Sequence, residues 1–248
     1  MTHIFGPVVS RRLGSSLGLD IIPLKVCSFD CVYCECGPTT LKTAERRPYV
    51  SVEAVMDELK AYLRDHPGKL DYITFSGSGE PTLNSNLGAM ISEIRKITPV
   101  PVAVLTNSSL IHLPDVIADL KLADLVIPSL DAVSDRNFRV IDRPLVDASP
   151  GSIVEALVRF RDAYPGQVWL EILLIDGHNT SDEEALLFKA AVERIRPDRL
   201  QLNTVDRPPI FDWVRPAPLA TLEHIAAIIG FAPVDIVAPK RKDGADRP

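Results

Sequence analysis

Residues 70–81 read Leu-Asp-Tyr-Ile-Thr-Phe-Ser-Gly-Ser-Gly-Glu-Pro, and this stretch predicts the repeating unit of the fold. The mostly apolar run Leu70 to Phe75 predicts a short buried strand, and the glycine-bearing segment after it predicts a loop. An amphipathic helix is expected to follow near Asn86 to Ile97. A strand, a polar loop and a helix in this order are the unit from which parallel α/β sheets are built.

The same unit recurs on both sides of this stretch. Further strands are predicted at Leu19 to Val26, Val102 to Leu105, Leu125 to Pro128, Val168 to Ile175 and Arg199 to Asn203. Further helices are predicted from Ser51 to Pro67, and near Pro114 to Leu120, Ile153 to Tyr164, Asp182 to Ile195 and Leu219 to Ile229. Such alternation indicates parallel strands joined by right-handed crossovers. A doubly wound sheet and a barrel both fit. We favour an α/β fold with a partial (β/α)6 TIM-like barrel, because only about six of a full barrel's eight units are visible.

In such a fold, chemistry lies where the parallel strands end, at their C-terminal edge. Five polar segments follow predicted strands directly and are therefore expected to meet there. They are the cysteine loop from Cys27, the loop Ser76 to Pro81, the pair Thr106-Asn107, the segment Ser129 to Asp131, and Asn203.

Length and charge set broad limits on the molecule. A chain of 248 residues is expected to form a single domain over residues 1–238, with a short N-terminal extension and a disordered tail at 239–248. The net charge of -6 argues against a surface dominated by phosphate-binding basic residues. No apolar run approaches the roughly 20 residues that cross a bilayer, and the first residues lack a signal-peptide pattern. We therefore expect a cytoplasmic protein without membrane contacts.

All four cysteines lie between positions 27 and 36, which indicates a metal or redox centre. Cys27, Cys31 and Cys34 have the spacing C-x3-C-x2-C, and thiolates suit iron–sulfur clusters, zinc or monovalent copper. Three thiolates can hold three irons of a cubane and leave the fourth iron open. A zinc site would use Cys36 as its fourth ligand. Because only one residue separates Cys34 from Cys36, it would be difficult for all four thiolates to surround one zinc ion. A thioredoxin-like thiol pair is the third alternative, and Cys36 is left without an assigned role.

The cysteine spacing, with Tyr33 before the third cysteine, resembles the signature of the radical S-adenosylmethionine (SAM) superfamily. The segment Gly77 to Pro81 resembles that family's Gly-Gly-Glu-Pro motif, from which it departs at one position. The resemblance implies a [4Fe-4S] cluster on Cys27, Cys31 and Cys34. It also implies SAM as cofactor, with Glu80 and the loop backbone binding the SAM amino group. The SAM-binding residues carried over by the resemblance are Tyr33, Gly77, Ser78, Gly79, Glu80, Pro81, Thr106, Asn107, Ser129 and Asp131.

The activity that this resemblance implies is reductive cleavage of SAM to a 5′-deoxyadenosyl radical, which then removes a hydrogen atom from a substrate. The electron would come from an external donor of the flavodoxin or ferredoxin type. Arg11 and Arg12 are candidates to hold a substrate phosphate or carboxylate, because paired guanidinium groups do this well. Asn203 and Arg207 are expected to face the same cavity from the end of the sixth strand. The proline-rich loop Arg207 to Pro218 is a candidate cover.

Several phrases resemble one branch of the superfamily, the stand-alone relatives of the wyosine-forming tRNA synthases. They include Gly6 to Gly14, Pro128 to Asp131 and Leu202 to Pro209. The wyosine-forming enzymes carry further cysteines upstream of the core, and this chain has none there. Three classes of function therefore stay open. These are a radical SAM enzyme for a nucleoside or RNA, one for a small metabolite or a partner protein, and a non-catalytic zinc or iron–sulfur module.

Overall fold

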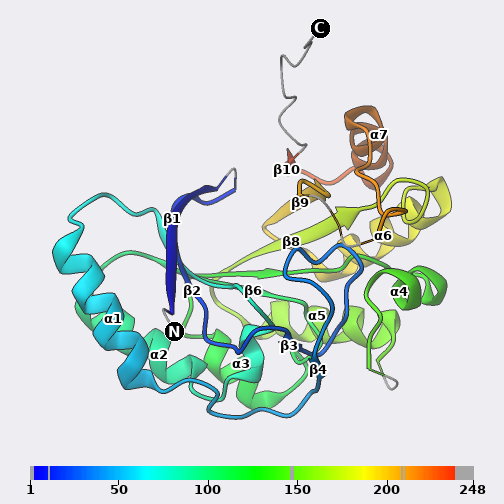
Figure 1. The fold of residues 1–248 in the computed structure, drawn as a ribbon. Coiled ribbons are helices and arrows are strands. Elements are labelled where there is room, and N and C mark those ends of the chain that lie inside the picture. Colours follow the sequence, from blue (N-terminus) through cyan, green and yellow to red (C-terminus); the bar gives the residue numbers. More distant parts are fainter. Residues whose placement is uncertain (1–2, 11, 146–147, 208, 210, 238–248) are drawn as a thin grey trace, which may run out of the picture.

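A computed structural model describes residues 3–10, 12–145, 148–207, 209 and 211–237. Over these residues, eight strands form one strongly curled, open sheet in the order β1-β2-β5-β6-β7-β8-β9-β10 (Figure 1). All neighbouring strands from β2 to β10 are parallel, whereas β1 pairs antiparallel with β2. The sheet is a half-barrel, and the predicted α/β partial barrel is confirmed. The predicted tail at 239–248 lies outside the described residues.

The strands of the large sheet are β1 Ile4–Ser10, β2 Gly14–Leu19, β5 Tyr72–Phe75, β6 Val102–Thr106, β7 Leu125–Pro128, β8 Gln167–Leu174, β9 Arg199–Thr204 and β10 Val234–Val237. Two short strands, β3 Val26–Cys27 and β4 Leu41–Lys42, pair separately within the cysteine loop. The helices are α1 Val52–Asp65, α2 Leu87–Ile97, α3 Pro114–Leu120, α4 Asp135–Ile141, α5 Pro150–Ala163, α6 Asp182–Ile195 and α7 Leu219–Ile229. A short 3-10 helix, Pro81–Leu83, follows β5.

The first predicted strand is wrong in position. The strand that precedes the cysteine loop is β2, which ends at Leu19, and the apolar run after it is a partly buried loop. Pro23 and the left-handed backbone of Lys25, with φ 59°, interrupt any extended run there. Ile21 and Ile22 are nevertheless buried, because this loop packs against the core. An apolar sequence can thus indicate burial without indicating a strand.

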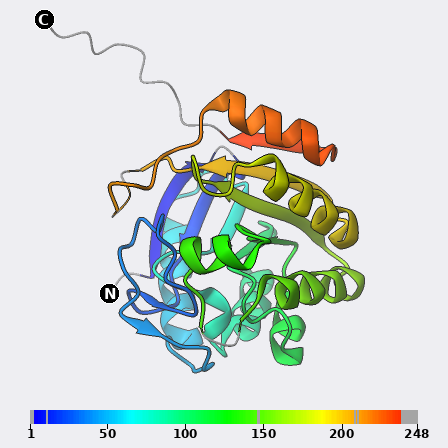
Figure 2. The same cartoon turned by 90° about the vertical axis from the view of Figure 1, so that its right-hand side faces the viewer.

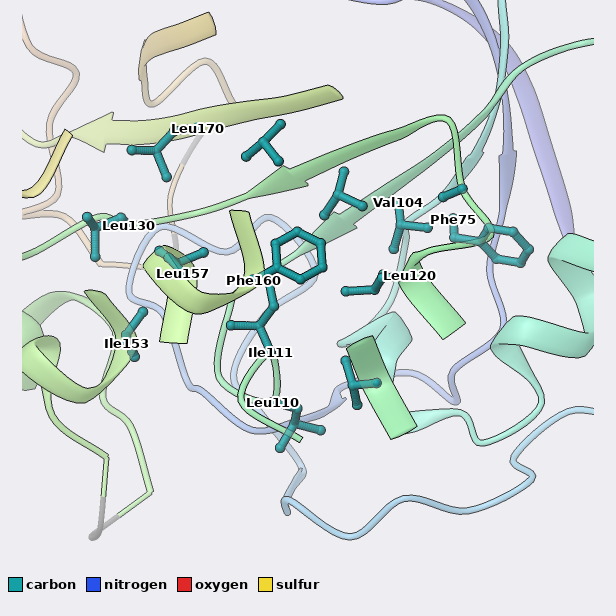
Figure 3. Close-up of a cluster of buried hydrophobic side chains, with 14 of the residues drawn as sticks. Phe75, Val104, Leu110, Ile111, Leu120, Leu130, Ile153, Leu157, Phe160 and Leu170 are labelled. Carbon is teal, nitrogen blue, oxygen red and sulfur yellow. The ribbon is translucent and has the colours of Figure 1, made fainter. Parts of the chain in front are cut away.

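Helices α5, α6 and α7 lie along the outer side of the curved sheet in Figure 2. Their apolar faces, those of α1, α2 and α3, and side chains of the strands make the main core, part of which appears in Figure 3. Phe160 of α5 belongs to this cluster together with Val104 of β6 and Leu170 of β8, and all three are fully buried. Each such side chain contributes about 1.5–3 kcal/mol on removal from water.

The opposite, concave face of the sheet has its own small cluster. Because side chains alternate along a strand, Ala103 and Leu125 point away from the main core. The turn between β1 and β2 brings Leu13 against them, with Trp169 of β8 beside the cluster. The N-terminal hairpin therefore fills part of the inside of the half-barrel.

Within the described residues, no helix combines the length and apolar character needed to cross a membrane.

Candidate active site

The cysteine loop connects β2 with α1, and none of its four half-buried thiols forms a disulfide. Backbone hydrogen bonds fasten the loop to the end of α4. The Asp30 N–H donates to the Asp142 carbonyl at 3.0 Å, and the Val32 N–H donates to the Ile141 carbonyl at 2.9 Å. Val32 is fully buried and packs with Ile141. The spacing of the cysteines is therefore held by tertiary contacts as well as by the local chain.

The loop after β5 packs directly on the cysteine loop. A Cβ atom on Gly79 would lie 2.1 Å from the Val26 carbonyl oxygen, so only glycine fits there. The Lys25 N–H donates to the Ser78 carbonyl at 2.9 Å, and the Ser78 N–H donates to the Asp20 carboxylate at 3.1 Å. The predicted SAM-binding loop and the predicted cluster loop are thus adjacent.

Glu80 ties this loop to the end of β6. Its side chain is 2% exposed. Oε1 accepts from the Thr82 N–H at 3.1 Å, the Thr82 hydroxyl at 2.6 Å and the Thr106 hydroxyl at 2.7 Å. Oε2 accepts from the Asn107 N–H at 2.7 Å. Burial raises the pKa of Glu80, and the donors on Thr82 and Asn107 counteract that rise. Protein donors engage both carboxylate oxygens, so contact with the SAM amino group stays a prediction.

Asn107 links the end of β6 to the cluster loop. Its amide Nδ2 donates to the Ser28 hydroxyl at 2.9 Å and lies 3.5 Å from Cys27 Sγ. Burial is the main reason that the pKa of Cys27 is raised to about 11, and the nearby charge of Glu80 adds to this. These effects outweigh the nearby charge of Lys25, which lowers this pKa, so the thiol resists ionisation. Metal binding would supply the missing stabilisation of its thiolate.

Tyr33 and Asp131 form a buried pair. The Tyr33 hydroxyl donates to Asp131 Oδ2, and the Leu173 N–H donates to Oδ1 at 2.8 Å. Burial raises the pKa of Asp131 to about 6. Ser129, at the end of β7, contributes its carbonyl to the Ser108 hydroxyl at 2.7 Å. These groups lie at the expected edge, but the bonds shown are within the protein, so their SAM contacts stay predictions.

Two charged groups beside the cysteines were missed by the sequence analysis. Lys25 is 4% exposed and its Nζ lies 3.1 Å from Cys34 Sγ. The Cys31 thiol donates to Asp142 Oδ1 at 3.8 Å, and Asp142 Oδ2 has no hydrogen-bond partner within the described residues. Burial raises the pKa of Asp142 well above its usual range. The only available sequence signal was the closeness of Lys25 to Cys27, because Asp142 is distant along the chain.

A cavity of about 480 Å³ opens beside this loop. Its walls include Tyr33, Cys34, Cys36 and Gly77 on one side, and Arg12, Glu171, Leu173, Asn203 and Arg207 on the other. The structure thus brings three of the four predicted substrate residues to one cavity, while Arg11 lies outside the described residues. Inside the cavity wall, Arg12 forms an ion pair with Glu171 of β8, a residue that the sequence analysis missed. Arg207 pairs with Glu35 of the cysteine loop, and Asn203 Oδ1 is buried without a partner among the described residues.

The proline-rich loop after β9, predicted as a candidate cover for the substrate, contacts the cysteine loop. Val214 is buried in the same small cluster as Val32, and Phe211 and Tyr33 pack against that cluster. The guanidinium of Arg143 lies 4.6 Å from the centre of the Phe211 ring. This loop therefore covers one side of the cysteine segment.

The donor set fits a cubane cluster. Three half-buried thiols lie on one loop, the ammonium of Lys25 approaches one of them, and the cavity gives access from one side. Among the described residues, no three His, Cys, Asp or Glu side chains converge on a single-ion position. A cubane binds each thiolate at a different iron and needs no such convergence.

The half-barrel and its three-cysteine loop define a class of protein, and comparison with known families gives the same class. A model of the radical SAM superfamily matches residues 21–189, and the chain belongs to this superfamily. It is 38% identical over 229 residues to a UPF0026 protein of Methanocaldococcus jannaschii, covering 92% of this chain and 71% of that protein. A UPF0026 protein of Helicobacter pylori is 35% identical over 241 residues, covering 96% of this chain and 76% of the relative. These matches make the chain a UPF0026 protein.

Two other similarities support less, because one covers a small share of the relative and the other has low sequence identity. The chain is 45% identical over 205 residues to a protein of Brachyspira hyodysenteriae named GTPase Obg. That match covers 83% of this chain but only 30% of the relative's length. A structure of TYW1 with a lysine–pyruvate adduct bound has a TM-score of 0.64 at 19% identity, covering 88% of this chain and 74% of TYW1. At that identity the likeness shows the fold alone, so the expected relation to the wyosine-forming branch stays a prediction.

Proposed function

We propose that the chain is a radical SAM enzyme that abstracts a hydrogen atom from a small polar substrate. The main observation that supports this proposal is that Cys34 and the substrate candidates Arg12, Asn203 and Arg207 line one cavity. The family membership supports a [4Fe-4S] cluster on Cys27, Cys31 and Cys34 with SAM as cofactor. When bound, these groups supply a one-electron cleavage of the SAM sulfonium, and with it the hydrogen-abstracting species.

The chain's own residues hold this chemistry in place. Glu80 fixes the loop after β5 to the end of β6 through two hydrogen bonds, from the Thr106 hydroxyl and the Asn107 N–H. The hydrogen bond to Asp131 fixes Tyr33, the residue before Cys34, against the ends of β7 and β8. A site held this rigidly can orient a reactive group toward one substrate hydrogen and keep water away from it. We assign no general acid or base.

Charge in the cavity favours a small substrate over RNA. Its walls carry the acids Glu35, Glu171 and Asp206 against the bases Arg12 and Arg207. Two of these acids are paired with the two arginines. RNA binding depends on clustered basic groups that neutralise phosphates, and neither this cavity nor the net charge of -6 offers them. A molecule with both acidic and basic or hydrogen-bonding groups fits such a surface better.

The electron must come from outside the chain, and we propose a flavodoxin-type or ferredoxin-type donor. Leu24 and Leu41 leave 63% and 49% of their surfaces exposed on the loop that carries the cysteines. Leu41 pairs in register with Val26, next to Cys27. Exposed apolar side chains so near the proposed cluster support a docking place for the donor there.

The test is SAM cleavage by the anaerobically reconstituted and dithionite-reduced chain. Formation of 5′-deoxyadenosine by the native chain and not by Cys27→Ala is expected. Cys36→Ala is the matched control, because it removes a thiol of the same loop that the proposal does not use as a cluster ligand. Purified protein that contains zinc instead of iron and leaves SAM intact would overturn the proposal.

A further inference from the structure

We propose that the ammonium group of Lys25 is a built-in countercharge for the iron–sulfur cluster and raises the cluster's reduction potential. The inference rests on the proposed function, since it concerns the group that Cys34 would hold. It assigns a role to a residue that lies outside the cysteine motif and is not among the residues that line the cavity.

The position of Lys25 is fixed by its backbone. Its N–H donates to the Ser78 carbonyl at 2.9 Å, and its carbonyl accepts from the N–H groups of Thr40 and Leu41 at 3.0 and 3.2 Å. The residue has φ 59°, a left-handed conformation that a side chain other than glycine's adopts only when its surroundings enforce it. The side chain is buried, and Nζ lies 3.1 Å from Cys34 Sγ.

The charge of Lys25 has the cysteines as its partners. The residue is 4% exposed, and among the ion pairs within the described part of the chain none includes Lys25. A buried ammonium without a carboxylate is costly unless anions lie close by, and the thiolates of a bound cluster would be those anions.

A positive charge at this position makes the cluster easier to reduce. Reduction adds one electron from the external donor and makes the cluster more negative by one charge, with no bond formed or broken in the protein. A fixed cation stabilises the more negative form more strongly than the oxidised form. Hydrogen bonds to cluster sulfurs and net charge are among the factors that set such potentials. Lys25 supplies both, through one N–H···S contact and one charge.

The experiment is a redox titration of the reconstituted cluster, followed by electron paramagnetic resonance in the absence of SAM. Lys25→Gln removes the charge, Lys25→Arg keeps it, and Lys42→Gln is the matched control. Lys42 lies on the same loop, but its exposed ammonium bonds to the Arg143 carbonyl at 2.7 Å. We expect Lys25→Gln to lower the equilibrium constant for reduction at least tenfold, a shift of about 59 mV to more negative potential for one electron. Lys25→Arg and Lys42→Gln should stay close to the native midpoint.

Each result bears on the proposal. A native midpoint in Lys25→Gln with full iron content would overturn it. Should that variant lose its iron, Lys25→Met provides a second neutral side chain. Iron loss from both neutral variants, with retention and a native midpoint in Lys25→Arg, would support a countercharge. Iron loss from all three would show a packing role and overturn the proposal. If the native chain itself gives no cluster signal, the proposed function fails first.

Discussion

Replacing Glu80 by Gln alters a carboxylate that is 2% exposed and accepts four hydrogen bonds. The new NH2 group has to occupy the place of one oxygen, and each place faces a backbone N–H. At Oε2 it would face the Asn107 N–H, and at Oε1 it would face the Thr82 N–H. The threonine hydroxyls can turn to accept a bond, but a backbone N–H cannot. One buried donor is therefore left without an acceptor in either orientation.

The magnitude follows from these contacts. An unsatisfied buried donor costs about 1–3 kcal/mol. The bonds that survive lose the strength that a charged acceptor gives them. Relief from burying a charge acts in the opposite direction, since burial raises the pKa of Glu80. We expect Glu80→Gln to lower the free energy of unfolding by about 2 kcal/mol, the cost of one orphaned donor with the other two effects partly cancelling.

The assay is urea unfolding of the metal-free protein, without SAM, under reducing conditions. Glu45→Gln is the control, because Glu45 is exposed and pairs with Arg47 on the surface, where such pairs contribute little. If Glu80 served only to bind the SAM amino group, its replacement would leave this protein's stability unchanged. A difference below about 0.5 kcal/mol between Glu80→Gln and the native chain would refute the structural role inferred here.

Three further changes test other parts of the site. Gly79→Ala should destabilise the chain by about 1–3 kcal/mol and reduce its iron content, because the methyl group would meet the Val26 carbonyl at 2.1 Å. Gly68→Ala, in open space, is its control, and equal melting temperatures and iron contents would contradict the expectation. Asp131 has a folded pKa of about 6, above its ordinary 3.8, so its contribution to stability is present below about pH 4 and is lost as the pH rises through 6. The free energy of unfolding of Asp131→Asn should therefore fall less than that of the native chain between pH 4 and 7.5, by up to about 3 kcal/mol, and parallel urea-unfolding profiles would count against this. Cys36→Ser should keep the native iron and sulfide content, because three cysteines suffice in the proposed cluster, and loss of one iron per chain would show otherwise.

The repeating unit of the fold was predictable because apolar periodicity reports burial. Strands such as β7, Leu125–Pro128, and helices such as α3, Pro114–Leu120, were predicted with the bounds that the structure shows. The two edge strands were not. Gly6 and Pro7 interrupt the pattern of β1, and β10 is a short run of half-buried residues. The strand predicted from Leu19 to Val26 was wrong because apolar periodicity does not distinguish a partly buried loop from a buried strand.

Only those site residues that follow the C-terminal ends of parallel strands could be predicted to lie together. Asn203 and Arg207 follow a strand that ends there, so their arrival at the cavity follows from parallel order. The partner of Arg12 could not be found in this way. Glu171 lies within the apolar-looking run of β8, and its pairing with Arg12 depends on how the N-terminal hairpin enters the half-barrel. Lys25 fell within the predicted strand Leu19 to Val26 and received no role, because a sequence does not show which lysines are buried.

The three cysteines occupy eight consecutive positions, yet their surroundings are built from chain that comes much later. Cys27 is approached by Asn107, and the segment around Cys31 is fastened to Ile141 and Asp142. During synthesis, Cys27 therefore leaves the ribosome 80 residues before Asn107, and Cys31 leaves it 111 residues before Asp142. The early chain has no means to protect a cluster from oxygen or to hold its thiols at the right spacing. Maturation of this protein should accordingly follow folding of the half-barrel, with iron and sulfide delivered to a finished site.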